Sequence, residues 1–239
     1  MVPGGLDQAI ILHCRPYRES SLFVDVLTRD HGRLRLLSRG ARRGRHQLSR
    51  ILRPFNRIRL SWTERGELPV LTLAESLGSG AELRGSAMYC GFYLCELLIC
   101  LQPLHDPHPG LYALCEATLA RLESTDDVER TLRRFEIAFL EEIGYGLRLE
   151  EDVEGQAIQS DRRYAYDPEH GASETTAASV GGCQGATLLA LRRGLLEDDI
   201  QLREAKHLLR SVLAHHLNGR TLKSRELFKP LSGRINHES

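Results

Sequence analysis

The sequence predicts an α+β fold in two parts, a small closed β-barrel followed by a helical region with an irregular insertion. Two patterns along the chain predict it. Residues 8–75 contain short segments in which apolar and polar residues alternate, which is the spacing of strands with one buried face. After residue 81 the apolar residues recur at helical spacing instead. We therefore expect the barrel in residues 1–78 and the helical domain in residues 79–239.

The predicted strands are short, and their alternation assigns each side chain to one face. Segment 22–28 alternates leucine and valine with a second, mixed face. Segments 33–38 and 57–62 place arginine on one face and aliphatic residues or tryptophan on the other. Segment 69–75 is a further strand candidate, and residues 30–32 form a turn in which Gly32 is able to adopt a positive φ. Five short strands with one apolar face and one arginine-rich face predict a small closed barrel.

Two polar segments interrupt this part of the chain. Residues 38–46 are too polar for a core and too rich in glycine for a stable helix. We therefore expect a mobile basic loop between the third and fourth strands. Residues 76–80, with the sequence SLGSG, predict the linker that ends the barrel.

The helical region is predicted from apolar spacing and from residues that cap helices. The third helix begins after Asp126, which forms a capping box with Glu129, and it ends at Gly144 and Gly146, which suit a left-handed cap. The predicted helices are 87–101, 111–123, 127–143, 185–194 and 201–217.

In one stretch of the helical region the apolar residues follow neither helical nor strand spacing. Residues 147–185 are acidic and contain glycine, and they predict an irregular excursion with one hairpin around residues 163–166. The tail from 218 to 239 is basic and less regular.

Composition excludes several classes of protein. The chain has 239 residues, of which 41% are apolar and 27% are charged, so we expect a globular protein with a buried core. The longest apolar run is far shorter than the roughly 20 residues that span a bilayer. The N-terminal residues lack the basic and apolar regions of a secretory signal. We therefore expect a cytoplasmic location.

The six cysteines do not have the spacing of a metal site. None belongs to a CxxC pair, and Cys90, Cys95 and Cys100 point in different directions when they lie five residues apart on a helix. Small buried side chains in a reduced compartment explain them best. We also interpret residues 105–109, with the sequence HDPHP, as a solvated loop rather than a metal site.

The net charge is zero, but the charges are segregated along the chain. Residues 1–80 carry a net charge of +7, residues 81–200 carry −12, and residues 201–239 carry +5. Between Arg29 and Arg59 there are eleven arginines and one acidic residue, Asp30. Arginines at alternate strand positions, together with an arginine-rich loop, form a surface that follows a phosphate backbone. The candidate DNA-binding residues are Arg33, Arg35, Arg39, Arg42, Arg43, Arg45, Arg57 and Arg59.

Three aromatic residues lie among these arginines and have two possible roles. Tyr17, Phe23 and Phe55 are either surfaces on which bases stack or part of the barrel core. Catalytic patterns are missing from the sequence: there is no GxxxxGK[ST], no GxSxG and no HExxH. We therefore expect a binding protein that is not an enzyme and uses no cofactor.

Four segments together resemble the bacterial DNA-repair and recombination mediator family RecO. They are HCRPYRESSLFVDVLTRDHGRLRLLSRGARR (13–43), RPF (53–55), TLRRFEIAFLEEIGYG (131–146) and LKSRELF (222–228), and they extend over nearly the whole chain. The resemblance implies an N-terminal OB fold followed by an all-α helical domain. It also implies binding of single- and double-stranded DNA, annealing of complementary strands without ATP, and association with the nucleoid.

The resemblance further implies three protein partners. These are single-stranded-DNA-binding protein, the mediator RecR and, indirectly, the recombinase RecA. In the family the acidic tail of the single-stranded-DNA-binding protein docks on the helical domain, and Arg133 and Arg134 are the matching positions here. The alternative is that both arginines pair with acidic residues on the same helix.

One departure concerns metal binding. Some members of the family carry a four-cysteine zinc module between the third helix and the last helices. Here residues 147–185 contain only Cys183, so the chain is similar to the zinc-free branch and we expect no metal. Two other functions stay open: an adaptor that binds acidic protein tails with only weak DNA contact, and a nucleic-acid enzyme that docks through the barrel.

Overall fold

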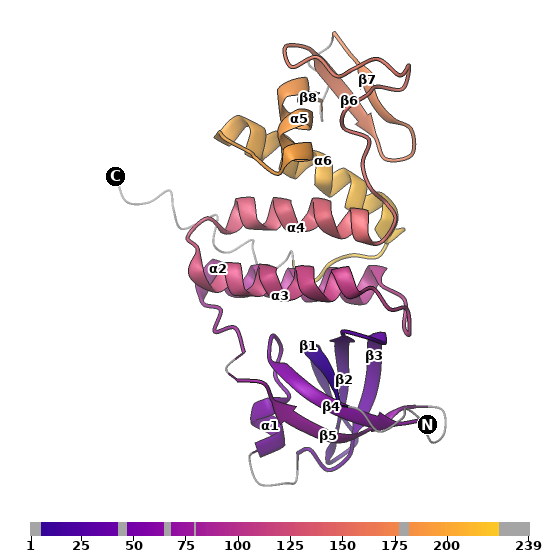
Figure 1. Cartoon of the computed structure of the whole chain (residues 1–239), viewed down its shortest axis with the longest axis vertical. Coiled ribbons are helices and arrows are strands. Elements are labelled where there is room, and N and C mark those ends of the chain that lie inside the picture. The colour runs from indigo at the N-terminus through magenta and orange to yellow at the C-terminus, as the bar shows by residue number, and fades with distance from the viewer. Residues whose placement is uncertain (1–5, 43–46, 65–67, 79, 177–181, 225–239) are drawn as a thin grey trace. The chain divides into compact units, whose positions relative to one another are not determined.

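The structure is a computed structural model that describes residues 6–42, 47–64, 68–78, 80–176 and 182–224. The chain divides into two compact units, which are described separately below (Figure 1). The first unit holds Met1–Thr125 and Leu222–Ser239, and the second holds Asp126–Thr221. The sequence-based domain boundary at residue 78 stays a prediction.

The first unit contains five strands, the number that the sequence predicts, and they close into a barrel. They are β1 (Asp7–Tyr17), β2 (Ser21–Thr28), β3 (Gly32–Ser38), β4 (Arg57–Thr63) and β5 (Val70–Ser76), with the short helix α1 (Gln47–Ile51) between β3 and β4. The strand order is β1-β2-β3-β5-β4, and β4 pairs back onto β1. Only β3 and β5 pair in parallel. This is an OB-like barrel, as expected from the sequence and the resemblance.

Alternation along the strands builds the barrel core, as predicted. Val24, Val26, Leu34 and Leu36 are fully buried inside the barrel, and Trp62 is 4% exposed. The predicted turn before β3 is confirmed, since Gly32 has a φ of +70°. Because the alternate residues of β1, β2 and β3 fill the interior, the residues between them lie on the outer face of the barrel.

Two longer helices follow the barrel in the first unit, and the loop between them is largely exposed, as expected. They are α2 (Gly85–Leu101) and α3 (Pro109–Ser124), which pack against each other. The loop also contacts β3: the His105 amide donates to the Arg33 carbonyl at 2.9 Å, and Leu104 forms a bridge with Arg33. A Cβ atom added at Gly32 would lie 2.1 Å from the Asp106 carbonyl oxygen, so glycine allows this close approach.

The second unit combines three helices with a small sheet. Its helices are α4 (Val128–Glu142), α5 (Gly185–Arg193) and α6 (Asp199–Leu217). The predicted hairpin is present as β6 (Arg163–Asp167) and β7 (Gly171–Glu174), and β8 (Cys183–Gln184) adds a third strand on the other side of β6. The excursion is therefore more regular than its sequence suggests.

The two ends of α4 show one wrong and one correct expectation. The N-cap is Asp127 rather than Asp126, because the Asp127 side chain accepts a hydrogen bond from the Arg130 amide. At the other end Gly144 has a φ of +83°, and the Tyr145 amide donates to the Leu140 carbonyl at 2.7 Å. Gly144 is therefore the left-handed glycine cap that the sequence predicts, whereas Gly146 does not have a positive φ.

The cysteines behave as buried side chains. Cys90, Cys95, Cys115 and Cys183 are buried, Cys14 and Cys100 are partly buried, and none of the six takes part in a disulfide bond. Burial raises the pKa of the Cys183 thiol to about 12, which disfavours the thiolate that metal binding or nucleophilic attack requires. In the part of the chain that the structure describes, no helix is long and apolar enough to cross a membrane.

Candidate nucleic-acid interface

The predicted arginines on the barrel do not form one continuous surface, because the outer face of β1, β2 and β3 has two different ends. Register places Arg15, Phe23 and Leu37 side by side near one end, and Asp25 beside Arg35 further along. We call the part around Asp25 and Arg33 the covered end, because the loop between α2 and α3 lies against it. We call the part around Arg15, Tyr17 and Phe23, with the turn at residues 18–20, the open end.

At the covered end Arg33 is held by internal partners. Its Nη1 lies 3.2 Å from Asp25 Oδ1, and its Nε donates to the Gln102 carbonyl at 2.8 Å. Arg33 is only 7% exposed, and Asp25 is 2% exposed. Burial lowers the pKa of the Arg33 guanidinium, and the attraction of Asp25 opposes that shift. Arg33 is therefore bonded within the first unit, and its buried side chain is not free to reach a phosphate in this structure.

Two more of the predicted arginines are paired but less buried. Arg35 Nε donates to the same Asp25 oxygen at 3.0 Å, and its side chain is 34% exposed. Arg57 lies on β4 and donates through Nη1 to Glu116 Oε1 on α3 at 2.7 Å. Their partners reduce the positive charge that each presents to a polyanion. Arg59, two residues along the same strand, is exposed, and no ion pair is recorded for it among the described residues.

The open end combines exposed arginines with a pair of aromatic rings. Tyr17 and Phe23 are partly exposed, and their ring centroids lie 4.3 Å apart. The guanidinium carbon of Arg15 lies 4.8 Å from the Phe23 ring centroid, and that of Arg18 lies 5.2 Å from the Tyr17 centroid. Both arginines are exposed. These distances are those of cation–π contacts.

The segment after β3 lies against the same hairpin turn. The Arg42 amide donates to the Ser20 carbonyl at 2.9 Å, and Arg42 Nη1 approaches the Arg18 carbonyl at 3.4 Å. Arg39 and Arg42 are both exposed. The expected loop character of residues 43–46, and with it the placement of Arg43 and Arg45, falls outside the described residues.

Arg15 and Arg18 were not among the arginines predicted to bind DNA. The density of arginine is highest between Arg29 and Arg59, but a weaker signal lies before it, since Arg15 and Tyr17 alternate on one strand face. The short connection to the next strand brings Phe23 opposite Arg15, which only the register shows.

The three candidate aromatic residues separate into two roles. Phe55 is 7% exposed, has a φ of +72°, and its ring lies 5.0 Å from that of Phe92 on α2. It therefore belongs to the interior of the first unit and is not available to stack on a base. Tyr17 and Phe23 lie on the outer face instead, outside the cluster of barrel core residues.

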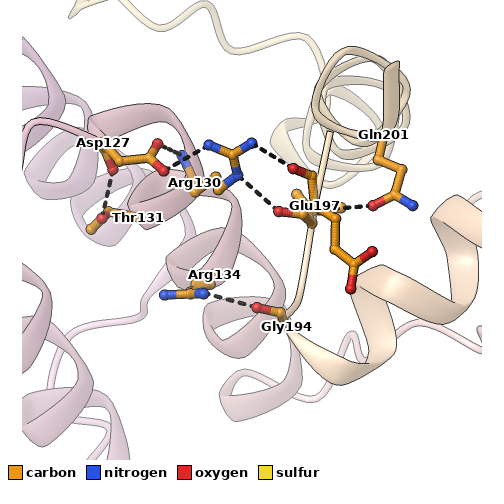
Figure 2. A network of polar contacts seen from close by, with 8 residues as sticks. Asp127, Arg130, Thr131, Arg134, Gly194, Glu197 and Gln201 are labelled. Atoms are coloured by element: carbon orange, nitrogen blue, oxygen red, sulfur yellow. Dashed lines mark hydrogen bonds and ion pairs between the residues drawn. The ribbon is translucent and has the colours of Figure 1, made fainter. Parts of the chain in front are cut away.

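The second unit holds the predicted partner-binding arginines on α4. Arg134 Nε donates to the Gly194 carbonyl at 2.9 Å. Arg130 donates to the Leu196 and Glu197 carbonyls at 2.8 and 3.1 Å, so both arginines tie the α5–α6 connection to α4 (Figure 2). They satisfy carbonyl groups that follow the end of α5.

Arg133 has a different environment. It is 7% exposed, and its Nη2 donates to Glu136 Oε1 at 3.0 Å on the same helix. Its Nη1 has no hydrogen-bond partner among the described residues. A small pocket in this unit is lined by Arg130, Arg133, Arg134, Ile137, Leu191, Gly194 and Leu196. A buried nitrogen with an unused donor therefore lies beside apolar side chains.

Metal ligation finds no support in the described part of the chain. No group of three or more His, Cys, Asp or Glu side chains there is arranged to hold a metal ion. Cys183, the one cysteine of the excursion, is 1% exposed and lies on β8.

Comparison with known proteins gives one family over almost the whole chain. Residues 6–79 match the family Recombination protein O N terminal, and residues 83–226 match Recombination protein O C terminal. The DNA repair protein RecO of Methylococcus capsulatus is 45% identical over 228 residues, which are 95% of this chain and 94% of the relative. That of Halorhodospira halophila is 44% identical, with 93% and 96% covered, and that of Xanthomonas oryzae pv. oryzae is 39% identical, with 95% and 98% covered.

Proposed function

The chain belongs to the RecO family of DNA repair proteins, and we propose that it binds single- and double-stranded DNA and anneals complementary strands without ATP. In this proposal it also helps to load the recombinase RecA onto DNA that is covered by single-stranded-DNA-binding protein. It acts in the cytoplasm, at the nucleoid. It needs no cofactor and no catalytic residue, because annealing makes and breaks no covalent bond.

The observation that carries the proposal is the group of exposed arginines at the open end. Arg15, Arg18, Arg39 and Arg42 lie on or beside one hairpin of an OB-like barrel, and all four are exposed. The corresponding face and loop of OB folds bind oligonucleotides. A guanidinium group also donates two hydrogen bonds to one phosphate, and this contact does not depend on the base sequence.

Electrostatics explains how such a surface promotes annealing. Two single strands repel each other through their phosphates, and a surface that neutralises some of these charges lowers the repulsion. Holding both strands also raises their local concentration. In the proposal this charge comes from the exposed residues Arg15, Arg18, Arg39, Arg42 and Arg59, with Arg43 and Arg45 as predicted additions. Arg35 and Arg57 contribute less, because Asp25 and Glu116 already neutralise them.

An annealing assay tests the proposal directly. Two complementary oligonucleotides are mixed with the protein, with and without ATP and magnesium, and duplex formation is followed. We expect faster annealing in every condition. Degraded strands would instead indicate a nucleic-acid enzyme, and an unchanged annealing rate would indicate an adaptor with weak DNA contact.

The proposed partner surface lies on α4 of the second unit. The acidic tail of single-stranded-DNA-binding protein supplies carboxylates and an apolar end. The small pocket on α4 is lined by Arg133 and Arg134 together with Ile137, Leu191 and Leu196, and a tail must open it further to reach Arg133, which is only 7% exposed. RecR is a second proposed partner, supported only by family membership.

Arg133 needs a careful variant, because its partner Glu136 is 1% exposed. Arg133→Ala alone leaves that carboxylate buried without its charge partner, which costs about 3–5 kcal/mol of stability. The double variant Arg133→Gln with Glu136→Gln keeps the shape and removes both charges. We expect it to fold and to lose binding of a tail peptide, measured by fluorescence anisotropy. Wild-type peptide affinity in the folded double variant would contradict this site.

Zinc content is a separate prediction. We expect metal analysis of the purified protein to find far less than one zinc per chain, because the excursion holds a single cysteine. Stoichiometric zinc would contradict the assignment to the zinc-free branch.

A further inference from the structure

The open end contains a pair of aromatic side chains, which contacts to a DNA phosphate backbone alone do not require. Tyr17 ends β1, and Phe23 lies near the start of β2, so the hairpin register places their rings on one outer face. The centroids are 4.3 Å apart with an interplanar angle of 48°. Neither ring is part of the barrel core, and both keep partial contact with solvent. A solvent-accessible aromatic pair on a strand face is a platform on which flat molecules stack.

The arginines around the pair determine which flat molecule fits. Arg15 and Arg18 lie over the two rings, and Arg42 contacts the turn between them. No acidic side chain is recorded as an ion-pair partner of these three arginines within the described residues. A ligand that combines an aromatic ring with negative charge at regular spacing matches this arrangement, and a nucleotide chain has both.

We infer that Tyr17 and Phe23 form a stacking site for unpaired bases, which gives the barrel a contact that exists with single-stranded DNA and not with duplex. This inference rests on the proposed DNA binding and adds its strand selectivity. In a duplex the bases are paired and stacked on each other, so their faces are not available to the rings. The arginines contact phosphates in either form of DNA, because those contacts do not depend on pairing.

Stacking of a base on the two rings is expected to be stronger than the cation–π contacts that the guanidinium groups make with them. An exposed cation–π contact contributes about two- to fivefold in an equilibrium constant. A stacked base contributes about 5- to 150-fold. The displaced guanidinium groups also gain phosphate partners from the same strand. Binding of a single strand therefore exchanges two weak contacts for stronger ones.

This selectivity has a consequence for annealing. When two bound strands pair, their bases leave the rings and only the phosphate contacts remain. The duplex is then held less tightly at this site than the strands from which it formed. The aromatic pair therefore favours release of the annealed product.

The test compares a thymidine oligonucleotide with an oligonucleotide of equal length and charge whose bases are replaced by abasic spacers. Affinity for each is measured by fluorescence anisotropy at one salt concentration, together with affinity for a duplex. We expect the wild-type protein to bind the thymidine strand about 5- to 150-fold more tightly than the abasic strand. Equal affinities would overturn the inference without any variant, while failure to bind any of the three would overturn the proposed DNA binding instead.

Substitutions of the two aromatic residues test whether their rings cause the difference in affinity between the thymidine strand and the abasic strand. In Tyr17→Leu with Phe23→Leu we expect the preference for bases to fall towards one, with duplex affinity within about twofold of wild type. Tyr17→Leu alone, at the strand end, shows a smaller fall if the double variant does not fold. Tyr145→Leu is the matched control, because Tyr145 is a 48% exposed aromatic residue in the second unit, and we expect it to keep the full preference. An unchanged preference in folded Tyr17→Leu with Phe23→Leu would overturn the assignment.

Discussion

The covered and open ends of the barrel face use the same residue type for different purposes. At the covered end Arg33 and Arg35 converge on one oxygen of Asp25, and Arg33 is almost completely buried. At the open end Arg15 and Arg18 are exposed and lie over aromatic rings. Both groups come from neighbouring strands of one sheet. The two ends differ in what packs on them, since the loop between α2 and α3 lies against the covered end.

This contrast shows that the density of arginine along a sequence does not reveal which of the arginines are exposed. A buried guanidinium must have partners, so a strand that carries one needs a carboxylate or carbonyl nearby. Asp25 and the Gln102 carbonyl fill that role for Arg33. An exposed guanidinium has no such requirement and is free to exchange water for phosphate.

The largest expected effect is on stability at the covered end. Asp25→Ala leaves Arg33 buried without its carboxylate, and we expect a loss of about 3–5 kcal/mol in the free energy of unfolding. Urea unfolding followed by the fluorescence of Trp62, which lies in the barrel core, measures it. Arg35→Ala is the matched control, because the Arg35 side chain is 34% exposed, and we expect a loss of about 1 kcal/mol or less. Equal losses in the two variants would show that burial does not distinguish these arginines.

The second effect concerns salt dependence at the open end. Replacing Arg39, Arg42 and Arg43 together by alanine removes charges that we expect to contact phosphates. The slope of log affinity against log salt concentration is negative, and we expect its magnitude to decrease by about 2–3. Affinity decreases by a similar factor for all base sequences. Anisotropy titrations at several salt concentrations measure this slope. Arg121→Ala, an exposed arginine in the last turn of α3, is the control with an unchanged slope, and an unchanged slope in the triple variant would exclude these residues from the interface.

Much of the fold was predictable because each element depends on local patterns. Alternation predicted the strands, and the residues assigned to the apolar face of 33–38 are fully buried. The left-handed turn at Gly32 and the glycine cap at Gly144 follow from the freedom of glycine at positive φ. The N-cap of α4 was displaced by one residue, since Asp126 and Asp127 are adjacent acids with the same capping ability.

The site was less predictable, because its differences arise from contacts between residues distant in sequence. The partner of Arg57 is Glu116, 59 residues away, and Arg33 meets the Gln102 carbonyl 69 residues away. No local pattern contains that information. The open end was missed for a related reason: Arg15 and Phe23 become neighbours only through the pairing of β1 with β2. Charge density therefore points to the barrel, but it does not show which of its arginines are exposed and which are paired.

The smallest expected effect tests whether an ion pair alone keeps an arginine from contributing to DNA binding. Two positions on β4 allow the comparison. Arg59 is exposed, and we expect Arg59→Ala to lower the salt slope for DNA binding by about 1. Arg57 is held by Glu116 at 2.7 Å, although both side chains are more than a third exposed, so the pair adds little stability. Glu116→Gln releases Arg57, and we expect the slope to steepen by up to about 1 while stability stays nearly constant. If releasing Arg57 leaves the slope unchanged, its position on β4, rather than its carboxylate partner, keeps it away from the DNA.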